Sequence, residues 1–169
     1  MVRTLLLNGA LALLLICPAA AQKPMPANTA PLAPNAPIDK PVSISEGAAD
    51  ATLADFTRRI APAVKKARAT LPQAKRRFLK GLPDGHAFFL STRLKDPNGN
   101  FEQVFVRVRL WDGVRIQGTI ANALGTVKTY QQNQLISFTE ADVLDWTISR
   151  PDGSEEGNYV GKLMDAWTN

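Results

Sequence analysis

The most regular pattern in the chain is an alternation of apolar and polar residues over positions 102–122. The even-numbered residues from Val104 to Leu110 are all apolar, and after the turn the even-numbered residues from Val114 to Ile120 are apolar except for Gly118. Alternation with a period of two is typical of a strand that buries one face. The segment therefore predicts two antiparallel strands joined near Asp112 and Gly113, with water excluded from one face of the sheet.

The turn of this hairpin decides which residues share a face. A two-residue loop at Asp112-Gly113 would place apolar residues of one strand opposite polar residues of the other. A three-residue loop, which pairs Leu110 with Val114, puts both apolar sets on the same face. Because a slip of one residue moves every side chain to the opposite face, we predict the three-residue loop, with Gly113 left-handed in a bulge.

The opposite face of the predicted hairpin is basic. The three-residue loop places Arg109 directly across from Arg115, and the preceding strand adds Arg93 to the same face. Like charges facing each other across strands are destabilising unless an anion lies between them. We predict that this polar sheet face binds a partner through five candidate residues: Arg93, Arg107, Arg109, Arg115 and Gln117.

Further strands flank the hairpin. Alternation over residues 86–94 predicts a strand that pairs with the central one through a turn at residues 96–100, with Leu94 opposite Val104. Short apolar runs at residues 135–138 and 144–149 predict two more strands. Residues 162–167 predict a last helical turn.

Residues 48–80 carry a helical stripe of apolar residues at spacings of three and four. Pro62 lies within this stripe, and a proline removes a backbone donor and clashes with the preceding turn. We therefore predict a kink or short break near Ala61. Thr70 and Gln73 have the spacing of a capping box around Pro72, which predicts that a second helix begins there.

The helical region is strongly basic. Residues 57–80 contain nine lysines and arginines and no acid, whereas residues 139–156 contain six acids and a single arginine. The basic run is consistent with a surface for an anionic partner, with a solvated helix face, or with pairing to the acidic region. We favour a solvated face with partial internal pairing.

The first 21 residues have the form of a signal peptide. Arg3 precedes an apolar run, and three alanines before Gln22 form a small-residue cleavage site. The run is shorter than the roughly 20 residues that span a membrane, which disfavours an anchor. Lipidation at Cys17, the only cysteine, is disfavoured by the bulky Ile16 before it. Cleavage after Ala21 would send the chain to the periplasm or outside the cell, with no membrane span remaining.

Residues 22–47 hold six prolines and almost no large apolar side chains. Such a segment cannot bury enough surface to offset its ordering entropy, so we predict a disordered Pro/Ala-rich linker. Residues 48–169 would then form a single domain.

The sequence contains no recognisable catalytic or metal-binding constellation. His86 is the only histidine and lies next to glycine without an acid-base partner, and neither a nucleophile elbow nor a phosphate-binding glycine loop is present. We predict no catalytic residue, no metal and no cofactor. Acidic pairs such as Asp142 and Asp145 leave open a hydrolase acting on envelope material, and a structural envelope protein is a further alternative.

Several short pieces of the chain resemble one bacterial family. They are Ala69-Thr70-Leu71-Pro72, Phe105-Val106-Arg107-Val108, Trp111-Asp112-Gly113, Gly118-Thr119-Ile120-Ala121-Asn122, Asp145-Trp146 and Glu156-Gly157-Asn158-Tyr159. Together they resemble the YegJ-like family, domain of unknown function number 2314, over residues 67–165. The resemblance implies a small α+β domain and supplies no catalytic residues.

We expect an α+β domain with a bent, partly barrel-like antiparallel sheet of about five strands, packed against the N-terminal basic helices. The expected function is that of an exported, non-enzymatic binding module. Its partner would be a protein or an anionic envelope component. The formal net charge of +5 is modest, and export argues against nucleic acid.

Overall fold

The computed structural model describes residue 37, residues 43–44 and residues 49–168. Its helices are α1 (Ala49–Lys80) and α2 (Tyr159–Thr168), and a short 3-10 helix, η1, spans Glu140–Asp142. Its strands are β1 (Ser43–Ile44), β2 (Ala87–Lys95), β3 (Phe101–Asp112), β4 (Arg115–Ile120), β5 (Leu135–Thr139), β6 (Asp145–Ser149) and β7 (Glu155–Gly157). The predicted signal peptide and most of the predicted linker lie outside the described residues; two linker residues form β1.

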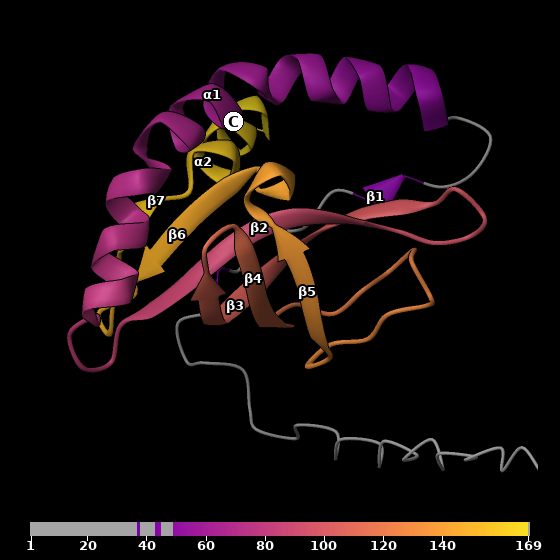
Figure 1. The fold of residues 1–169 in the computed structure, drawn as a ribbon. Helices are drawn as coiled ribbons and strands as arrows, with labels where there is room; N and C mark the ends of the chain where they lie inside the picture. Colours follow the sequence, from indigo (N-terminus) through magenta and orange to yellow (C-terminus); the bar gives the residue numbers. More distant parts are fainter. Residues whose placement is uncertain (1–36, 38–42, 45–48, 169) are drawn as a thin grey trace, which may run out of the picture.

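The strands form one antiparallel sheet in the order β5-β4-β3-β2-β6-β7, and β1 pairs with β3. The predicted α+β class is confirmed, with more strands than expected. The sheet does not close into a barrel, because β5 and β7 are its two end strands. In Figure 1, α1 arches over one face of the sheet, and α2 lies between α1 and β6.

Helix α1 runs without a break for 32 residues although Pro62 and Pro72 lie inside it. The predicted break near Ala61 and the predicted second helix from Thr70 are therefore wrong. The apolar stripe stays on one side of the helix throughout, and burial of that stripe outweighs the two lost hydrogen bonds. The helix bends instead (Figure 1).

The main core lies between α1 and the sheet, which confirms that helix covers the apolar face. Trp146 of β6 stacks on Phe88 of β2 with an angle of 9° between the rings, and its indole nitrogen donates to the Thr70 hydroxyl at 2.9 Å. The other buried members of this cluster are Ala67, Leu71, Ala74, Leu90, Val108, Trp111, Ile116, Val143 and Ile148. One helix face and four strands thus share a single apolar layer.

The β3–β4 turn differs from the predicted one. It is a two-residue turn at Gly113-Val114, so Asp112 pairs with Arg115, and the predicted pairing of Leu110 with Val114 is wrong. Gly113 is left-handed as predicted, with a φ of 53°.

A bulge between Val108 and Leu110 compensates for this turn. The extra residue shifts the alternation by one, so that Trp111 joins Val108 on the buried face and pairs with Ile116. Trp111 is only 4% exposed, whereas Leu110, predicted to be buried, is 53% exposed. The rule that one face excludes water therefore holds, but a bulge inside the strand satisfies it rather than the turn.

The β2–β3 pairing is shifted by two residues from the prediction. Leu94 pairs with Glu102, not with Val104, around the predicted turn at residues 96–100. Because a shift of two leaves every side chain on its original face, the apolar residues of both strands still share one side.

The second face of the sheet was predicted to be accessible along its whole length. Part of it is buried instead. Phe89 and Phe105 lie on this face and are 0% and 4% exposed, clustered with Ala87 and Ala121. Their neighbour Ser91 is buried as well. The accessible part of this face lies towards the β3–β4 turn and β5.

Glu102 is a buried carboxylate that holds the loop between β4 and β5. It is 2% exposed and accepts hydrogen bonds from the backbone amides of Gly125 (2.9 Å), Thr126 (3.0 Å) and Val127 (3.2 Å). Successive amides of this kind compensate a buried negative charge. Glu102 is thus accounted for by a structural role.

The structure explains the glycine at the start of the piece Gly118-Thr119-Ile120-Ala121-Asn122. A Cβ at this position would lie 2.4 Å from the carbonyl oxygen of Arg107 and 2.6 Å from Cγ1 of Val106. We expect Gly118→Ala to lower the free energy of unfolding by about 1–3 kcal/mol, because the neighbouring backbone must move. Urea denaturation followed by tryptophan fluorescence measures this.

Gly125→Ala is the matched control. A Cβ there meets no atom within 4 Å, and the amide that Glu102 accepts from is retained. Its stability should stay within about 0.5 kcal/mol of wild type. Equal unfolding midpoints for both variants would contradict the close approach at Gly118.

Candidate functional site

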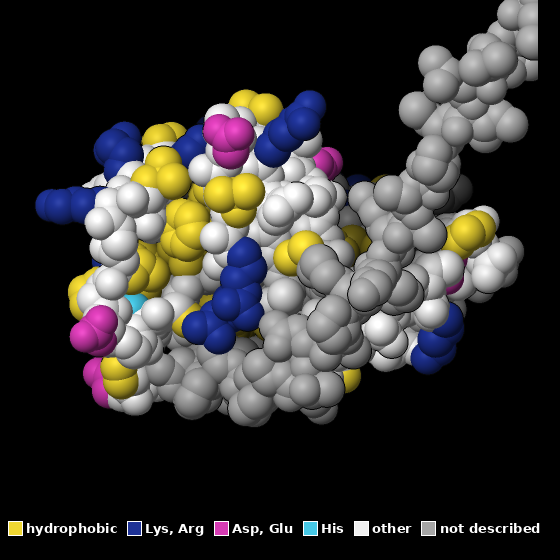
Figure 2. Space-filling model, turned by 60° about the horizontal axis from the view of Figure 1, so that its bottom comes forward, with side chains coloured by type: hydrophobic (Ala, Val, Ile, Leu, Met, Phe, Trp, Pro, Cys, Tyr) yellow, Lys and Arg dark blue, Asp and Glu magenta, His cyan; other side chains and the backbone are white. Residues whose placement is uncertain are grey.

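The accessible end of the second face carries three of the four predicted arginines. Its cross-strand rows are Arg107–Thr119–Leu135, Leu110–Gln117–Ser137 and Asp112–Arg115–Thr139. Arg109 is the extra residue of the bulge beside Leu110. We call Arg107, Arg109, Arg115 and Gln117 the arginine face. Figure 2, in which the bottom of the molecule in Figure 1 is turned forward, shows lysine and arginine side chains next to hydrophobic ones.

The arginines of the arginine face form no ion pair with the described parts of the chain. None of the ion pairs found there involves Arg107, Arg109 or Arg115. Partial burial, and after it the positive charge of Arg109, lowers the pKa of Arg107. The predicted repulsion between Arg109 and Arg115 is wrong, because Arg115 lies opposite Asp112; the like charges that influence each other are Arg107 and Arg109.

A polar cluster fixes the tip of the β3–β4 hairpin against α1. The Lys75 ammonium donates to the carbonyl of Gly113 at 2.6 Å and forms an ion pair with Glu140, which also accepts from the Trp111 indole at 2.8 Å. Burial opposes ionisation of Glu140, but the hydrogen bonds from Lys75 and Trp111 outweigh it and lower its pKa. The amide of Glu140 also donates to the carbonyl of Val114 at 3.0 Å. The strands that carry Arg109 and Arg115 are thus held in place from behind.

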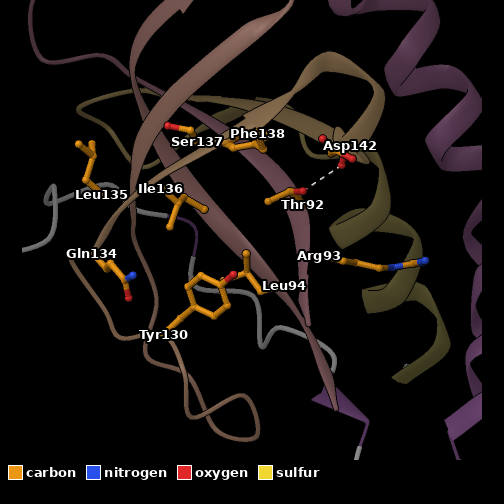
Figure 3. Close-up of a pocket in the computed structure, with 10 residues that line it drawn as sticks. All are labelled: Thr92, Arg93, Leu94, Tyr130, Gln134, Leu135, Ile136, Ser137, Phe138 and Asp142. Atoms are coloured by element: carbon orange, nitrogen blue, oxygen red, sulfur yellow. Dashed lines mark hydrogen bonds between the residues drawn. The ribbon is translucent and has the colours of Figure 1, made fainter. Parts of the chain in front are cut away.

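Arg93 does not belong to the arginine face. Its guanidinium lies 6.0 Å from the ring centre of Phe56 in α1 and 5.9 Å from that of Phe101. Burial lowers its pKa, and Nε and Nη2 have no hydrogen-bond partner in the described structure. In Figure 3 its side chain points away from the other residues, towards the helices. Arg93 is therefore not available to a partner that binds the arginine face.

A hollow of about 450 Å³ lies beside β5 (Figure 3). Its walls are Thr92, Arg93 and Leu94 of β2, Leu135, Ile136, Ser137 and Phe138 of β5, and Tyr130, Gln134 and Asp142 from the connecting segments. This volume lies in the range of about 300–1,000 Å³ that is usual for ligand pockets. Leu94, Ile136 and Phe138 give it an apolar floor, while the Thr92 hydroxyl donates to the carbonyl of Asp142 at 3.0 Å.

The two carboxylates considered as an acidic pair have separate partners. Asp145 is 1% exposed and accepts from the amides of Val160 at 2.6 Å and Trp146 at 2.8 Å, so that it caps the start of α2. Burial raises its pKa to about 6 against these hydrogen bonds. Asp142 is exposed, and the hydroxyl and amide of Thr139 lower its pKa.

The described residues contain no group of three or more potential metal ligands among histidine, cysteine, aspartate and glutamate. No helix within the same part of the chain is long and apolar enough to cross a membrane. What this surface presents is guanidinium groups, exposed leucines and an apolar hollow.

Sequence reasoning identified the arginines but missed the hollow. Its walls come from residues 92–94 and 130–142, which no local pattern brings together. The available signal was that residues 129–139 contain no charged side chain although they include an end strand.

Residues 49–168 match the family described as an uncharacterised protein conserved in bacteria, domain of unknown function 2314. The chain belongs to this family. The match begins at the start of α1, so the first part of the helix, which the sequence analysis left outside the resemblance, lies within it. No curated protein and no solved structure matches the chain.

The raised pKa of Asp145 predicts a pH dependence of stability. Its folded pKa of about 6 lies above the ordinary 3.8, so its favourable contribution is complete below pH 3.8 and is lost as the pH rises through 6. A shift of this size corresponds to about 3 kcal/mol. We expect Asp145→Asn to remove this loss, so that the change in unfolding free energy from pH 4 to pH 7.5 is about 2–3 kcal/mol more favourable in the variant than in wild type.

Asp142→Asn serves as the control for this titration. The pKa of Asp142 is lowered, so its contribution is lost as the pH falls, and its removal should change the pH profile in the opposite sense. Urea unfolding at several pH values measures both variants. Profiles of wild type and Asp145→Asn that run parallel would contradict the assignment.

Proposed function

We propose that this member of the family is a binding module, not an enzyme, whose arginine face takes an acidic protein or an anionic component of the cell envelope. The observation that carries the proposal is the absence of any ion-pair partner for Arg107, Arg109 and Arg115 within the described residues. Some other basic residues of the described chain do form ion pairs: Lys75 pairs with Glu140, and Arg77 and Arg150 pair with Glu156.

The composition of the surface supports recognition. Leu110 and Val114 are 53% and 61% exposed at the hairpin tip, next to Arg109 and Arg115. Exposed apolar side chains among arginines are typical of interaction surfaces, where arginine is enriched and gives bidentate contacts to carboxylates. Because Lys75 and Glu140 hold the hairpin, binding would cost little ordering of the backbone.

A hydrolase acting through carboxylates has less support. Asp145 is committed to the start of α2, and Asp142 is hydrogen-bonded to Thr139, so the two do not form an acid and base directed at one reacting group. A purely structural role would not account for an unpaired arginine face.

The proposal predicts a localised effect of charge removal. We expect Arg109→Ala with Arg115→Ala to weaken binding of poly-L-glutamate at least about tenfold at moderate salt, since two charge-assisted contacts are lost. Phosphatidylglycerol vesicles, tested in parallel, distinguish an acidic polypeptide from a lipid headgroup. Capture from envelope extract with the same variants identifies the natural partner.

The matched control is Lys65→Ala with Arg76→Ala, which removes the same charge from exposed positions of α1. It should weaken binding no more than about twofold, and circular dichroism should show both double variants folded. If the two variants lose affinity equally, net charge rather than the arginine face accounts for binding.

We also propose that the protein is exported, on the basis of the charged, apolar and small-residue segments of residues 1–21. The expected product begins at Gln22. Intact mass of the protein recovered from the periplasmic fraction of a bacterial host measures this. A mass that retains Met1 or Cys17 would contradict cleavage after Ala21.

A further inference from the structure

We infer that the partner contributes an extended peptide segment that adds to the outer edge of β5 and lies in the hollow between β5 and β2. This rests on the proposed function and specifies the form of the partner: a segment in which acidic and apolar residues alternate. The segment would extend the sheet at the point where it fails to close.

The lining of the hollow places it along two strand edges. Residues 135–138 of β5 all line it, as do residues 92–94 of β2. Successive side chains of a strand point to opposite faces, so a space touched by all of them lies along the edge, where the backbone is exposed. β5 is an end strand, and β2 pairs with β6 only as far as Ser91. The hollow therefore lies between two edges that have no strand partner among the residues that the structure describes.

The hydrogen-bond phase of β5 shows which of its backbone groups face the hollow. The amide of Ile120 donates to the carbonyl of Gln134, and the amide of Glu140 donates to that of Val114, both at 3.0 Å. The backbone groups of the even-numbered residues in this segment thus bond to β4. In an antiparallel ladder, the backbone N–H and C=O groups of the odd-numbered residues between them point away from β4. The backbone groups of Leu135 and Ser137 are accordingly directed outward and are available to an added strand.

The β5 edge lacks the usual protection against pairing. End strands commonly carry charges, prolines or bulges that prevent another strand from adding. Residues 129–139 contain no charged residue and no proline, and β5 pairs with β4 without a bulge. An unprotected edge beside an apolar hollow is the arrangement that strand addition requires.

The two sides of an added strand would meet different chemistry. Side chains on one side would enter the hollow, against Leu94, Ile136 and Phe138. Those on the other side would lie beyond Leu135 and Ser137, on the same surface as Arg115. Strands are spaced about 4.8 Å apart, so the guanidinium of Arg115, two strands away, can reach a carboxylate on the segment. Apolar residues are therefore expected on the inner side and acidic residues on the outer side.

The proline-rich part of this chain is a poor occupant. Residues 22–47 contain six prolines, which have no amide to donate to a ladder, and only two acids. A partner segment from another protein fits the charge and hydrogen-bonding pattern better. Pairing of β5 with a second copy of the chain is the alternative that the experiment must exclude.

The test uses a short fluorescent peptide of alternating valine and glutamate and the chain without residues 1–21. We expect saturable binding by fluorescence anisotropy, at least about tenfold tighter than for the valine–lysine peptide. Hydrogen exchange followed by NMR should show the amides of Leu135 and Ser137 protected on binding. Peptides N-methylated on alternate residues extend the test: methyl groups on one set should abolish binding, and methyl groups on the other should not.

Ser137→Pro removes an outward amide and should abolish peptide binding, while Ser137→Ala, which keeps the amide, should bind as wild type. The N-methylated peptides keep the inference testable if Ser137→Pro does not fold. Equal binding of both methylated peptides, unprotected Leu135 and Ser137 amides, or no binding of the acidic peptide would overturn strand addition.

Poly-L-glutamate separates the two proposals. If Ser137→Pro still binds poly-L-glutamate, and the peptide does not protect the β5 amides of wild type from exchange, strand addition is overturned and binding by the arginine face is retained. Unchanged poly-L-glutamate binding by Arg109→Ala with Arg115→Ala would overturn the arginine face itself. A wild-type dimer that Ser137→Pro converts to monomer in sedimentation would assign the β5 edge to a second copy and overturn the inference.

Discussion

Exclusion of water from the layer between α1 and the sheet sets the positions of most other parts of the molecule. The helix contributes small side chains, Ala67 and Ala74, that let Trp146 and Phe88 of the sheet approach it closely. This burial keeps α1 continuous through two prolines, because most helical stability in proteins comes from packing of an apolar face rather than from each backbone bond. The bend of the helix follows the curvature of the sheet beneath it (Figure 1).

The same helix distributes the charge of the chain. Its buried side faces the core, while its flanks direct basic side chains to acceptors in the acidic region: Arg68 donates to the carbonyls of Val143 at 3.1 Å and Ala141 at 2.9 Å, and Arg77 pairs with Glu156. The predicted partial internal pairing is thus confirmed in the described residues. Part of the basic run on α1 therefore holds η1 and β7 in place, whereas the arginines of β3 and β4 form no ion pair within the described residues.

Four features could be predicted from the sequence: the fold class, the covering of one sheet face by the basic helix, the turn at residues 96–100 and the left-handed Gly113. Each of them depends on local chemistry or on burial of a single face. The sequence did not allow the pairing register to be derived. A bulge at Arg109 with a two-residue turn buries Val108 and Ile116 just as the three-residue loop does, and differs only in burying Trp111 in place of Leu110 and Val114, so the alternation of apolar residues alone could not distinguish them. Likewise, a two-residue shift between β2 and β3 changes no face.

For the candidate site, too, the sequence predicted which residues share a face but not their exact positions. Arg107, Arg109, Arg115 and Gln117 lie on one surface, because residues of one face stay together in any register that buries Val104, Val106 and Val108. Arg93 left this set because the ring systems of Phe56 and Phe101, distant in sequence, enclose its guanidinium. The hollow beside β5 depends on how far the sheet curves, which side-chain periodicity does not encode.

The bulge in β3 has a consequence for reading related sequences. Because the inserted position is an arginine, one irregularity both turns the indole of Trp111 inward and brings a second cation next to Arg107. The number of residues between Val108 and Gly113 therefore indicates whether a related sequence has the bulge. A relative with one residue fewer in this segment would lose both the added cation and the buried indole.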